Sequence, residues 1–365
     1  MAVNVLHPVD PDLGAGRRPP IRDGNRKAGS GFIFDLADTY DLWNFLLTSS
    51  SNLDTVAAWF YGGVPEGLLP FEKSFFRPIK RFRRGKMSRE KIAIRRMERD
   101  EVELALEWAA QEGWNPGLHD AECFYAADPR GFFMAEIDGE PVGCISAVAY
   151  EENFGFAGFF IVREDVRHLG IGMMLTRKAM DYLGDRTVGG DGVVGMLPKY
   201  EQIGFRIAHQ NARYEGVGAV SGGPLSDLRD LPFSELEQYD RRFFPAPRTA
   251  FLERWISRPG TRGCAATVDG RVAGYGIIRP CRVGFKIGPL FADTPEVAED
   301  LFRSLTGFAE GEKIFLDIPV CNPFARELAE RHAMQKVFET ARIYKGDAPP
   351  LPLQSIYGIT SFELG

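Results

Sequence analysis

The chain has 365 residues, enough for two or three domains, and 44% of them are hydrophobic, as in an ordinary globular protein. A net charge of -6 and a pI of about 5.6 argue against nucleic-acid binding as the main function, because such proteins usually carry a basic excess. The five cysteines are dispersed, without the spacing of metal ligands, and no apolar run is long enough to cross a membrane. We therefore expect a cytoplasmic protein with no bound metal, no secretory signal and no transmembrane span.

The first 91 residues differ in composition from the rest of the chain. Residues 1–30 are rich in Pro, Gly and Arg without periodic apolar positions, which predicts a flexible tail. Residues 31–91 form an aromatic and basic extension of unknown fold and role. A short helix is expected from Asp54 to Gly63, and the basic run Arg77–Lys91 is typical of a solvated linker, although it also suits an acidic surface or nucleic acid. The extension can dock on a protein or a membrane surface, or fold back onto the core, and the sequence leaves these alternatives open.

From residue 92 onward the pattern becomes regular. It predicts an amphipathic helix, a β-hairpin with its turn at Asp138-Gly139, an apolar central strand, a helix, a strand, a short helix and a final strand. The expected ranges are 100–111, 131–137 with 141–150, 154–162, 172–183, 187–194, 199–203 and 205–214. This order predicts an α/β fold with a mixed (α+β) sheet that begins antiparallel and has a strand–loop–helix crossover at its centre.

Parts of this pattern occur twice. Asp138–Gly143 is repeated as Asp269–Gly274, and Ala212–Gly216 is repeated, in the same order along the chain, as Ala341–Gly346. We therefore expect two lobes of one fold. The expected divisions are a first lobe at 92–216, a linker at 217–232 and a second lobe at 233–365.

One loop carries the clearest chemical signal. Arg167-His168-Leu169-Gly170-Ile171-Gly172 stands between a predicted buried strand and a predicted helix. Glycines let the backbone approach a ligand closely, and the free N–H groups at a helix start attract negative charge. Arg167 adds a positive charge that persists at neutral pH. The pattern predicts a pyrophosphate-binding loop.

The chain resembles the GNAT superfamily of N-acetyltransferases. Val162–Gly172 resembles its motif A, with Glu164 where proline is common, and Lys199–Phe205 resembles a later motif of the superfamily. Residues 92–365 also resemble a two-lobed bacterial subfamily with a degenerate C-terminal GNAT-like domain. The segments that carry this second resemblance are Trp114–Gly117, Val188–Gly192 and Arg279–Arg282.

The resemblance implies an acetyl-coenzyme A (acetyl-CoA) site in the first lobe. Strand backbone would pair with the pantetheine arm, a backbone N–H would stabilise the oxyanion, and the loop would hold the pyrophosphate. The residues expected to bind the coenzyme are Phe160, Ile161, Val162, Arg167, His168, Leu169, Gly170, Ile171, Gly172 and Met173.

Catalytic residues are harder to place from the sequence. Tyr200 matches a position that often protonates the departing thiolate in this superfamily, although a core aromatic fits the pattern too. A general base must take a proton from the amine, and the candidates are Asp191 and His119, then Glu136 and Asp120. Asp191 also suits a turn aspartate bonded to its own backbone, and His119 an exposed loop residue.

The second lobe lacks the pyrophosphate loop. At the corresponding point the chain passes from a strand directly into a helix start at Asp293–Glu296, where further carboxylates follow at Glu299 and Asp300. These carboxylates complement the helix dipole and would repel a pyrophosphate. We therefore expect only the first lobe to bind coenzyme A.

The predicted function is direct acetyl transfer from acetyl-CoA, as cosubstrate, to a small-molecule primary amine. Two alternatives stay open: a GNAT-like acyl-thioester decarboxylase or acyl transferase acting on a carrier protein, and a non-catalytic module that senses coenzyme A. The sequence does not specify the acceptor, and it does not specify the oligomeric state.

Overall fold

Two halves with the same order of elements make up the described part of the computed structural model, residues 92–219 and 225–365. The helices and strands predicted for the first half are confirmed, with ends that shift by a few residues. The first half contains β1 (Ile92–Arg96), α3 (Val102–Gln111), α4 (Asp120–Ala127), β2 (Phe132–Ile137), β3 (Glu140–Tyr150), β4 (Phe154–Val162), α5 (Ile171–Leu183), β5 (Thr187–Val193), α6 (Leu197–Gln202) and β6 (Arg206–Val217). The predicted tail, the helix at Asp54–Gly63 and the basic run lie outside the described residues.

The second half repeats this series. It contains β7 (Ser226–Asp227), α7 (Phe233–Asp240), α8 (Thr249–Ser257), β8 (Arg262–Val268), β9 (Arg271–Pro280), β10 (Phe285–Ala292), α9 (Pro295–Phe308), β11 (Lys313–Pro319), α10 (Pro323–Arg331), β12 (Gln335–Lys345) and β13 (Ile356–Gly358). Even the hairpin turns match. Asp138 and Gly139 have φ of 52° and 82°, while Asp269 and Gly270 have φ of 51° and 74°, as a two-residue type I′ turn requires.

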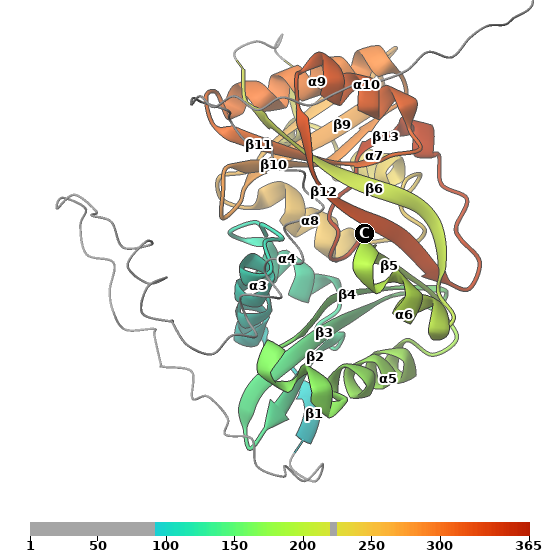
Figure 1. Ribbon diagram of the computed structural model, residues 1–365. Coiled ribbons are helices and arrows are strands. Elements are labelled where there is room, and N and C mark those ends of the chain that lie inside the picture. The colour runs from blue at the N-terminus through green and yellow to red at the C-terminus, as the bar shows by residue number, and fades with distance from the viewer. Residues whose placement is uncertain (1–91, 220–224) are drawn as a thin grey trace, which may run out of the picture. The chain divides into compact units, whose positions relative to one another are not determined.

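The two lobes share one mixed sheet of 13 strands among the described residues. Its order is β1-β2-β3-β4-β5-β12-β6-β11-β10-β9-β8-β7, with β13 beside β10. The sequence predicted β6 as the strand that closes the first lobe, but β12 lies between β5 and β6, so each lobe receives a strand from the other. Figure 1 shows β6 and β12 side by side at the junction.

Two equivalent ion pairs fasten this exchange. Arg342 on β12 faces Asp191 on β5, and its guanidinium makes two hydrogen bonds of 2.9 and 2.8 Å to the carboxylate. Arg213 on β6 faces Asp317 on β11 with bonds of 2.6 and 2.7 Å. Arg213 and Arg342 occupy the same place in the sequence repeat. The same kind of Arg–Asp ion pair therefore joins the lobes at two equivalent positions.

Aromatic packing between α4 and α8 adds a second contact between the lobes. The Phe124 ring stacks on Trp255 with 5.9 Å between centroids, and it meets the Phe159 ring of β4 edge-on at 5.6 Å. These rings belong to one hydrophobic core that contains buried residues from both lobes. The lobes are therefore held together by a continuous sheet and a shared core.

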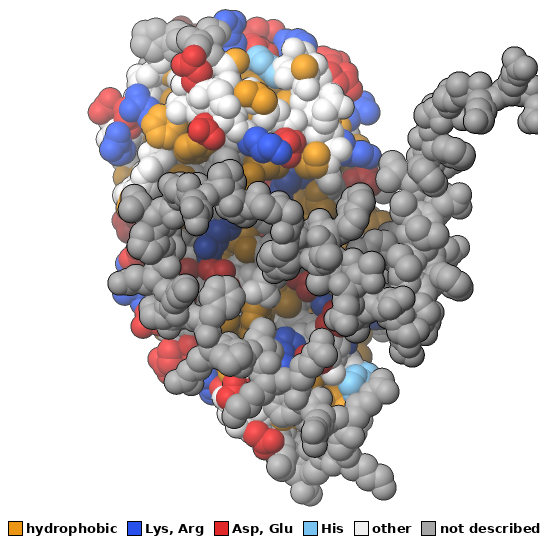
Figure 2. All heavy atoms as spheres, turned by 60° about the vertical axis from the view of Figure 1, so that its left-hand side comes forward, with side chains coloured by type: hydrophobic (Ala, Val, Ile, Leu, Met, Phe, Trp, Pro, Cys, Tyr) orange, Lys and Arg blue, Asp and Glu red, His pale blue; other side chains and the backbone are white. Residues whose placement is uncertain are grey.

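The surface of the described parts carries charges of both signs (Figure 2). On the face of the molecule drawn in Figure 2, acidic and basic side chains are interspersed over the described parts. None of the helices among the described residues is long and apolar enough to span a membrane.

Candidate active site

A cavity of about 670 Å³ opens in the first lobe, where β4 and β5 separate. The two strands pair in parallel from Phe154 with Thr187 as far as Ala157 with Gly190, and no further. Beyond Ala157, β4 pairs only with β3, so its other edge faces the cavity. A free strand edge offers unpaired N–H and C=O groups to an extended ligand.

A bulge turns β4 at this point. Cys144 pairs with Ile161 but Ser146 pairs with Gly158, so β4 holds one extra residue there. Phe159 adopts a φ of 46°, and its carbonyl oxygen accepts a hydrogen bond from the Cys144 thiol at 3.1 Å. Bulges re-aim the backbone locally, and this one lies where β4 borders the cavity.

The loop after β4 ends in an open helix start. A 3-10 segment, Glu164–Leu169, leads to Gly170, whose φ of 78° suits glycine, and α5 begins at Ile171. The first intrahelical bond runs from Met174 N–H to the Gly170 carbonyl, so the N–H groups of the first turn stay unpaired by the helix. At Gly172 a methyl group would lie 3.1 Å from the Phe160 ring. The helix start is thus a narrow cradle suited to an anion.

Arg167 lies at the mouth of this cradle. Its Nε donates to the Val162 carbonyl at 2.9 Å, and its Nη2 lies 2.8 Å from the Glu112 carboxylate. The Arg167 side chain is 52% exposed, so this ion pair is weak and can be exchanged for a stronger anion.

The second lobe forms the same kind of bulge but fills the space beside it. β10 shifts register against β9 between Ile287 and Leu290. On the other side of β10 lies β13, which pairs Leu290 with Gly358 and Phe291 with Ile356. The strand edge that stays free beside β4 is therefore covered beside β10 by the chain itself.

Comparisons with known proteins agree with this geometry. Residues 99–199 match the Acetyltransferase (GNAT) family, and residues 236–358 match an Acetyltransferase (GNAT) domain. The chain belongs to the GNAT superfamily. It carries two GNAT domains in tandem and is an acyltransferase.

Relatives match this chain over most of their own length. The holothin acyltransferase of Pseudoalteromonas sp. (strain SANK 73390) is 28% identical over 270 residues, covering 73% of this chain and 92% of that protein. The uncharacterized N-acetyltransferase YitH of Bacillus subtilis is 23% identical, covering 74% of this chain and 97% of its own. The crystal structure of a proposed acetyltransferase from Pyrococcus horikoshii has the same fold, with a TM-score of 0.66 at 21% identity, over 78% of this chain and all of that one (100%).

Most residues predicted to bind the coenzyme border the GNAT cavity. The exceptions are His168, Leu169 and Ile171, which do not line it. His168 is exposed on the loop, and Ile171 is fully buried in the core beneath α5. Backbone groups in the loop can still face a ligand when the side chains do not.

Tyr200 also lines the cavity. It lies on α6, and its ring packs so closely on Gly192 that a methyl group there would lie 2.8 Å from the ring. Burial raises the pKa of Tyr200, so its hydroxyl keeps its proton at neutral pH. No hydrogen-bond partner of this hydroxyl is found among the described residues. The group is therefore free to donate its proton to a ligand.

Asp191 borders the cavity as well, but its carboxylate is engaged. Besides Arg342, it accepts a bond of 2.7 Å from the Asn211 amide, and its side chain is fully buried. Burial raises the pKa of Asp191, and Arg342 opposes that rise. Asp317 makes the equivalent pair in the second lobe, where β13 covers the strand edge of β10. Asp191 therefore lies in strand β5, paired with Arg342, and not in the backbone-bonded turn that the sequence also suggested.

The structure brings none of the other proposed bases to this cavity. His119 is exposed before α4, Glu136 pairs with Arg95 at 2.5 Å, and Asp120 is buried against two arginines. Their places offer no contact with an amine held beside β4.

Sequence reasoning missed part of the cavity wall. Phe338 and Thr340 of β12 reach it through the strand exchange, and Phe362 and Glu363 reach it from the segment after β13. No local motif marks these residues, because only the topology brings them to the first lobe.

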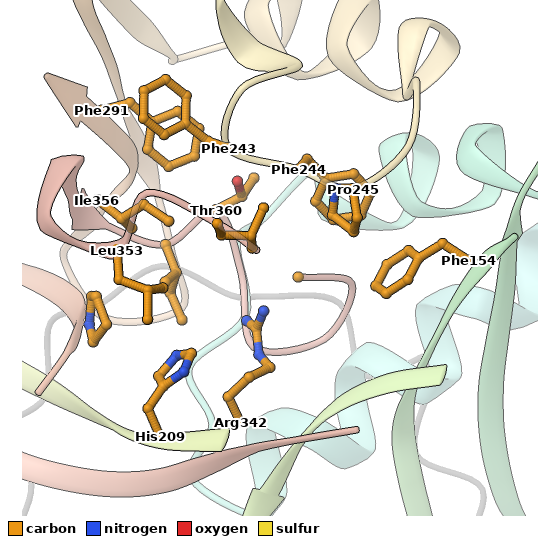
Figure 3. Close-up of a pocket in the computed structure, with 14 residues that line it drawn as sticks. Phe154, His209, Phe243, Phe244, Pro245, Phe291, Arg342, Leu353, Ile356 and Thr360 are labelled. Carbon is orange, nitrogen blue, oxygen red and sulfur yellow. The ribbon is translucent and has the colours of Figure 1, made fainter. Parts of the chain in front are cut away.

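A second cavity, which His209 and Arg342 line, holds about 20 Å³, enough for about one water molecule. Figure 3 shows His209 and Arg342 on one side of it, with Thr360 between them and the stacked rings of Phe243 and Phe291. Burial, with a smaller contribution from Arg342, lowers the pKa of His209 to about 4. This imidazole is therefore neutral at physiological pH and belongs to the packed junction.

Proposed function

We propose that this acyltransferase moves an acetyl group from acetyl-CoA directly to a small-molecule primary amine. The observation that carries the proposal is the cavity beside β4, which joins a free strand edge, a bulge and an open helix start. Its volume of about 670 Å³ is of the size expected for small-molecule sites.

The pyrophosphate and the pantetheine arm of acetyl-CoA each have a matching surface in this cavity. The pyrophosphate suits the start of α5, where a methyl group at Gly172 would crowd the Phe160 ring, with Arg167 as its counter-charge. The pantetheine amides suit the free edge of Phe160–Val162. The domain divisions, the coenzyme-binding residues and Tyr200 as expected from the sequence form part of this proposal, as does binding by the first lobe alone.

The chemistry needs no enzyme nucleophile. The neutral amine attacks the thioester carbonyl carbon, the carbon–sulfur bond breaks, and a backbone N–H at the bulge stabilises the oxyanion between these steps. The Tyr200 hydroxyl gives its proton to the departing thiolate, and the amine nitrogen loses a proton to a base.

A thiol-release assay with a panel of primary amines tests the proposal. Holothin, the acceptor in the name of the Pseudoalteromonas relative, belongs in that panel. We expect amine-dependent release of coenzyme A by the wild type. In contrast, Arg167→Glu with Gly170→Asp should remove it, because the two changes add negative charge to the cradle.

Arg254→Glu in α8 of the second lobe is the matched control, since its side chain is exposed and, among the described residues, bonds only the Ala250 carbonyl. It should keep wild-type activity. Thiol release by the wild type without any amine would instead favour thioester hydrolysis or decarboxylation. Binding of acetyl-CoA with no release under any condition would favour a sensing module.

A further inference from the structure

Glu363 differs from the other buried carboxylates of the described residues. Each of the others has a strong partner: Asp191, Asp240 and Asp317 lie within 2.8 Å of an arginine nitrogen. Asp120 pairs with Arg258, and Asp128 accepts a bond from Tyr182. They are all accounted for by the fold.

Glu363 is 3% exposed, and no hydrogen bond or ion pair of its carboxylate is found within the described ranges. A buried charge without a partner destabilises the folded protein, as does removing one partner of a buried ion pair. Such a group is expected where a ligand supplies the missing partner.

The backbone of Glu363 lies directly beside the bulge of β4. A methyl group at Gly158 would overlap the Glu363 carbonyl oxygen, so only glycine permits this approach. Gly158 precedes Phe159, the residue with positive φ, and both residues line the cavity together with Glu363. Glu363 therefore borders the part of the cavity where β4 bends.

The second lobe holds this segment in place. β13 occupies the slot beside β10, and the next residue, Ile359, donates its N–H to the Asp317 carbonyl at 2.8 Å. Leu364 N–H then bonds the Ser361 hydroxyl at 3.0 Å, which closes a turn around Glu363. The slot that would hold a coenzyme in the second lobe thus anchors the segment that brings Glu363 to the first.

Aromatic side chains line the same cavity as Glu363. Trp114, Phe338 and Phe362 line it, and the last two rings lie 6.2 Å apart. Aromatic walls bind flat apolar groups, while a carboxylate among them binds a positive charge. The combination suits a primary amine attached to an aromatic body.

Buried cations surround Glu363 from several strands. Arg213 on β6, Arg279 on β9 and Lys286 on β10 interact electrostatically with it, without forming ion pairs. Arg213 is paired with Asp317, and Arg279 lies 3.1 Å from Asp120. Arg279 shares Asp120 with Arg258, and no ion pair of Lys286 is found among the described residues, so these charges are only partly offset. None of the three cations donates a hydrogen bond to the Glu363 carboxylate within the described ranges, so its oxygens stay available to a ligand.

We propose that Glu363 is the catalytic base, pairing with the ammonium group of an arylalkylamine acceptor and taking its proton before the amine attacks. This inference rests on the proposed function. Glu363 takes one proton from the ammonium group, so an N–H bond breaks and an O–H bond forms, and it later releases this proton to water. The neutral amine then attacks, and a second proton leaves its nitrogen and replaces the one that Tyr200 gives to the thiolate. The nitrogen lone pair forms the amide bond, and the departing thiolate takes its proton from Tyr200.

The test compares Glu363→Gln with the wild type, using benzylamine and 2-phenylethylamine as acceptors. We expect kcat/KM for the amine to fall about 100-fold near neutral pH, because a positioned base contributes about that much. The loss should shrink towards about pH 9.5, where more of the amine arrives already neutral. Glu363→Asp keeps a carboxylate and should lose less than Glu363→Gln.

Glu215→Gln is the matched control, because this half-buried carboxylate on β6 pairs with Lys313 and lies outside the cavity. Thermal melts should show that all three variants remain folded, and stabilisation by acetyl-CoA should be unchanged in each. A Glu363→Gln enzyme with wild-type turnover, or with an equal loss at every pH, would overturn the role of Glu363 and leave the proposed function standing. A wild type that binds acetyl-CoA but releases no thiol with any amine would overturn both.

Discussion

The two lobes use one strand arrangement in opposite ways. Beside β4 the first lobe keeps an open slot that leads to a glycine-lined helix start. Beside β10 the second lobe fills that slot with β13, and its helix α9 is capped by the Thr294 side chain. The comparison shows how a repeated fold can divide its work: one copy offers a ligand site, and the other supports the chain segment that borders it.

The largest expected effect concerns the two buried ion pairs that join the lobes. Asp317→Asn leaves Arg213 buried without its charge partner and should cost about 3–5 kcal/mol of unfolding free energy. Asp191→Asn should cost a similar amount through Arg342. Urea unfolding of both variants measures this. An Asp191→Asn protein with wild-type stability and no turnover would instead make Asp191 a catalytic group.

The next largest effect is expected for Tyr200→Phe in the first lobe. The change removes the proton donor for the thiolate, so kcat should fall about 100-fold, equivalent to about 2.7 kcal/mol, while acetyl-CoA still binds. Tyr357→Phe, at a tyrosine of β13 in the second lobe, should leave kcat unchanged. Steady-state kinetics decides, and an unaltered kcat for Tyr200→Phe would contradict the role.

A substitution in the filled slot should act on stability. At Gly358 of β13 a methyl group would lie 2.8 Å from the Leu316 side chain and 3.1 Å from Leu290. Gly358→Ala should therefore cost about 1–3 kcal/mol. Gly307→Ala in α9 meets open space and should be neutral or stabilising. If thermal melts show equal values for the two variants, β13 does not fill the slot tightly.

Acid should loosen the junction between the lobes. Burial alone would raise the pKa of Asp317, but the charge and hydrogen bonds of Arg213 outweigh it and hold that pKa below its usual range. A lowered folded pKa contributes stability above the unfolded value of about 3.9, and the contribution is lost as pH falls through the folded value. Asp317→Asn should therefore flatten the acid side of the stability curve, and an unchanged slope would contradict this.

The smallest expected effect lies at the mouth of the open slot. Glu112 competes with a pyrophosphate for Arg167, and their pair is exposed to solvent. Glu112→Gln should tighten acetyl-CoA binding by only about two- to five-fold, in line with the strength of surface ion pairs. Weaker binding in this variant would show that Glu112 supports the site.

Local patterns in the sequence predicted much of the fold. The hairpin turn at Asp138-Gly139, its repeat at Asp269-Gly270 and the glycines of the loop required only neighbouring residues. The exchange of β6 and β12 did not follow from them, because a strand next to β5 looks the same in sequence whether it comes from one lobe or the other. The sequence indicated Asp191 as a residue near the ligand, but its partner Arg342 lies 151 residues away, so no local pattern could predict their ion pair.

The candidate site divides in the same way. The coenzyme end is built from one continuous stretch, so a motif reveals it. The wall that contains Phe338, Phe362 and Glu363 is assembled from the second lobe and the segment after β13. Glu363 carries no signal in the sequence, since an acidic residue near such a segment would normally be read as exposed.

Titration calorimetry with acetyl-CoA tests the central claim most directly. The account predicts one binding site for each chain, lost in Arg167→Glu with Gly170→Asp and kept in Arg254→Glu. Two sites for each chain, or undiminished binding by the loop variant, would contradict the division of work between the open and the filled slot.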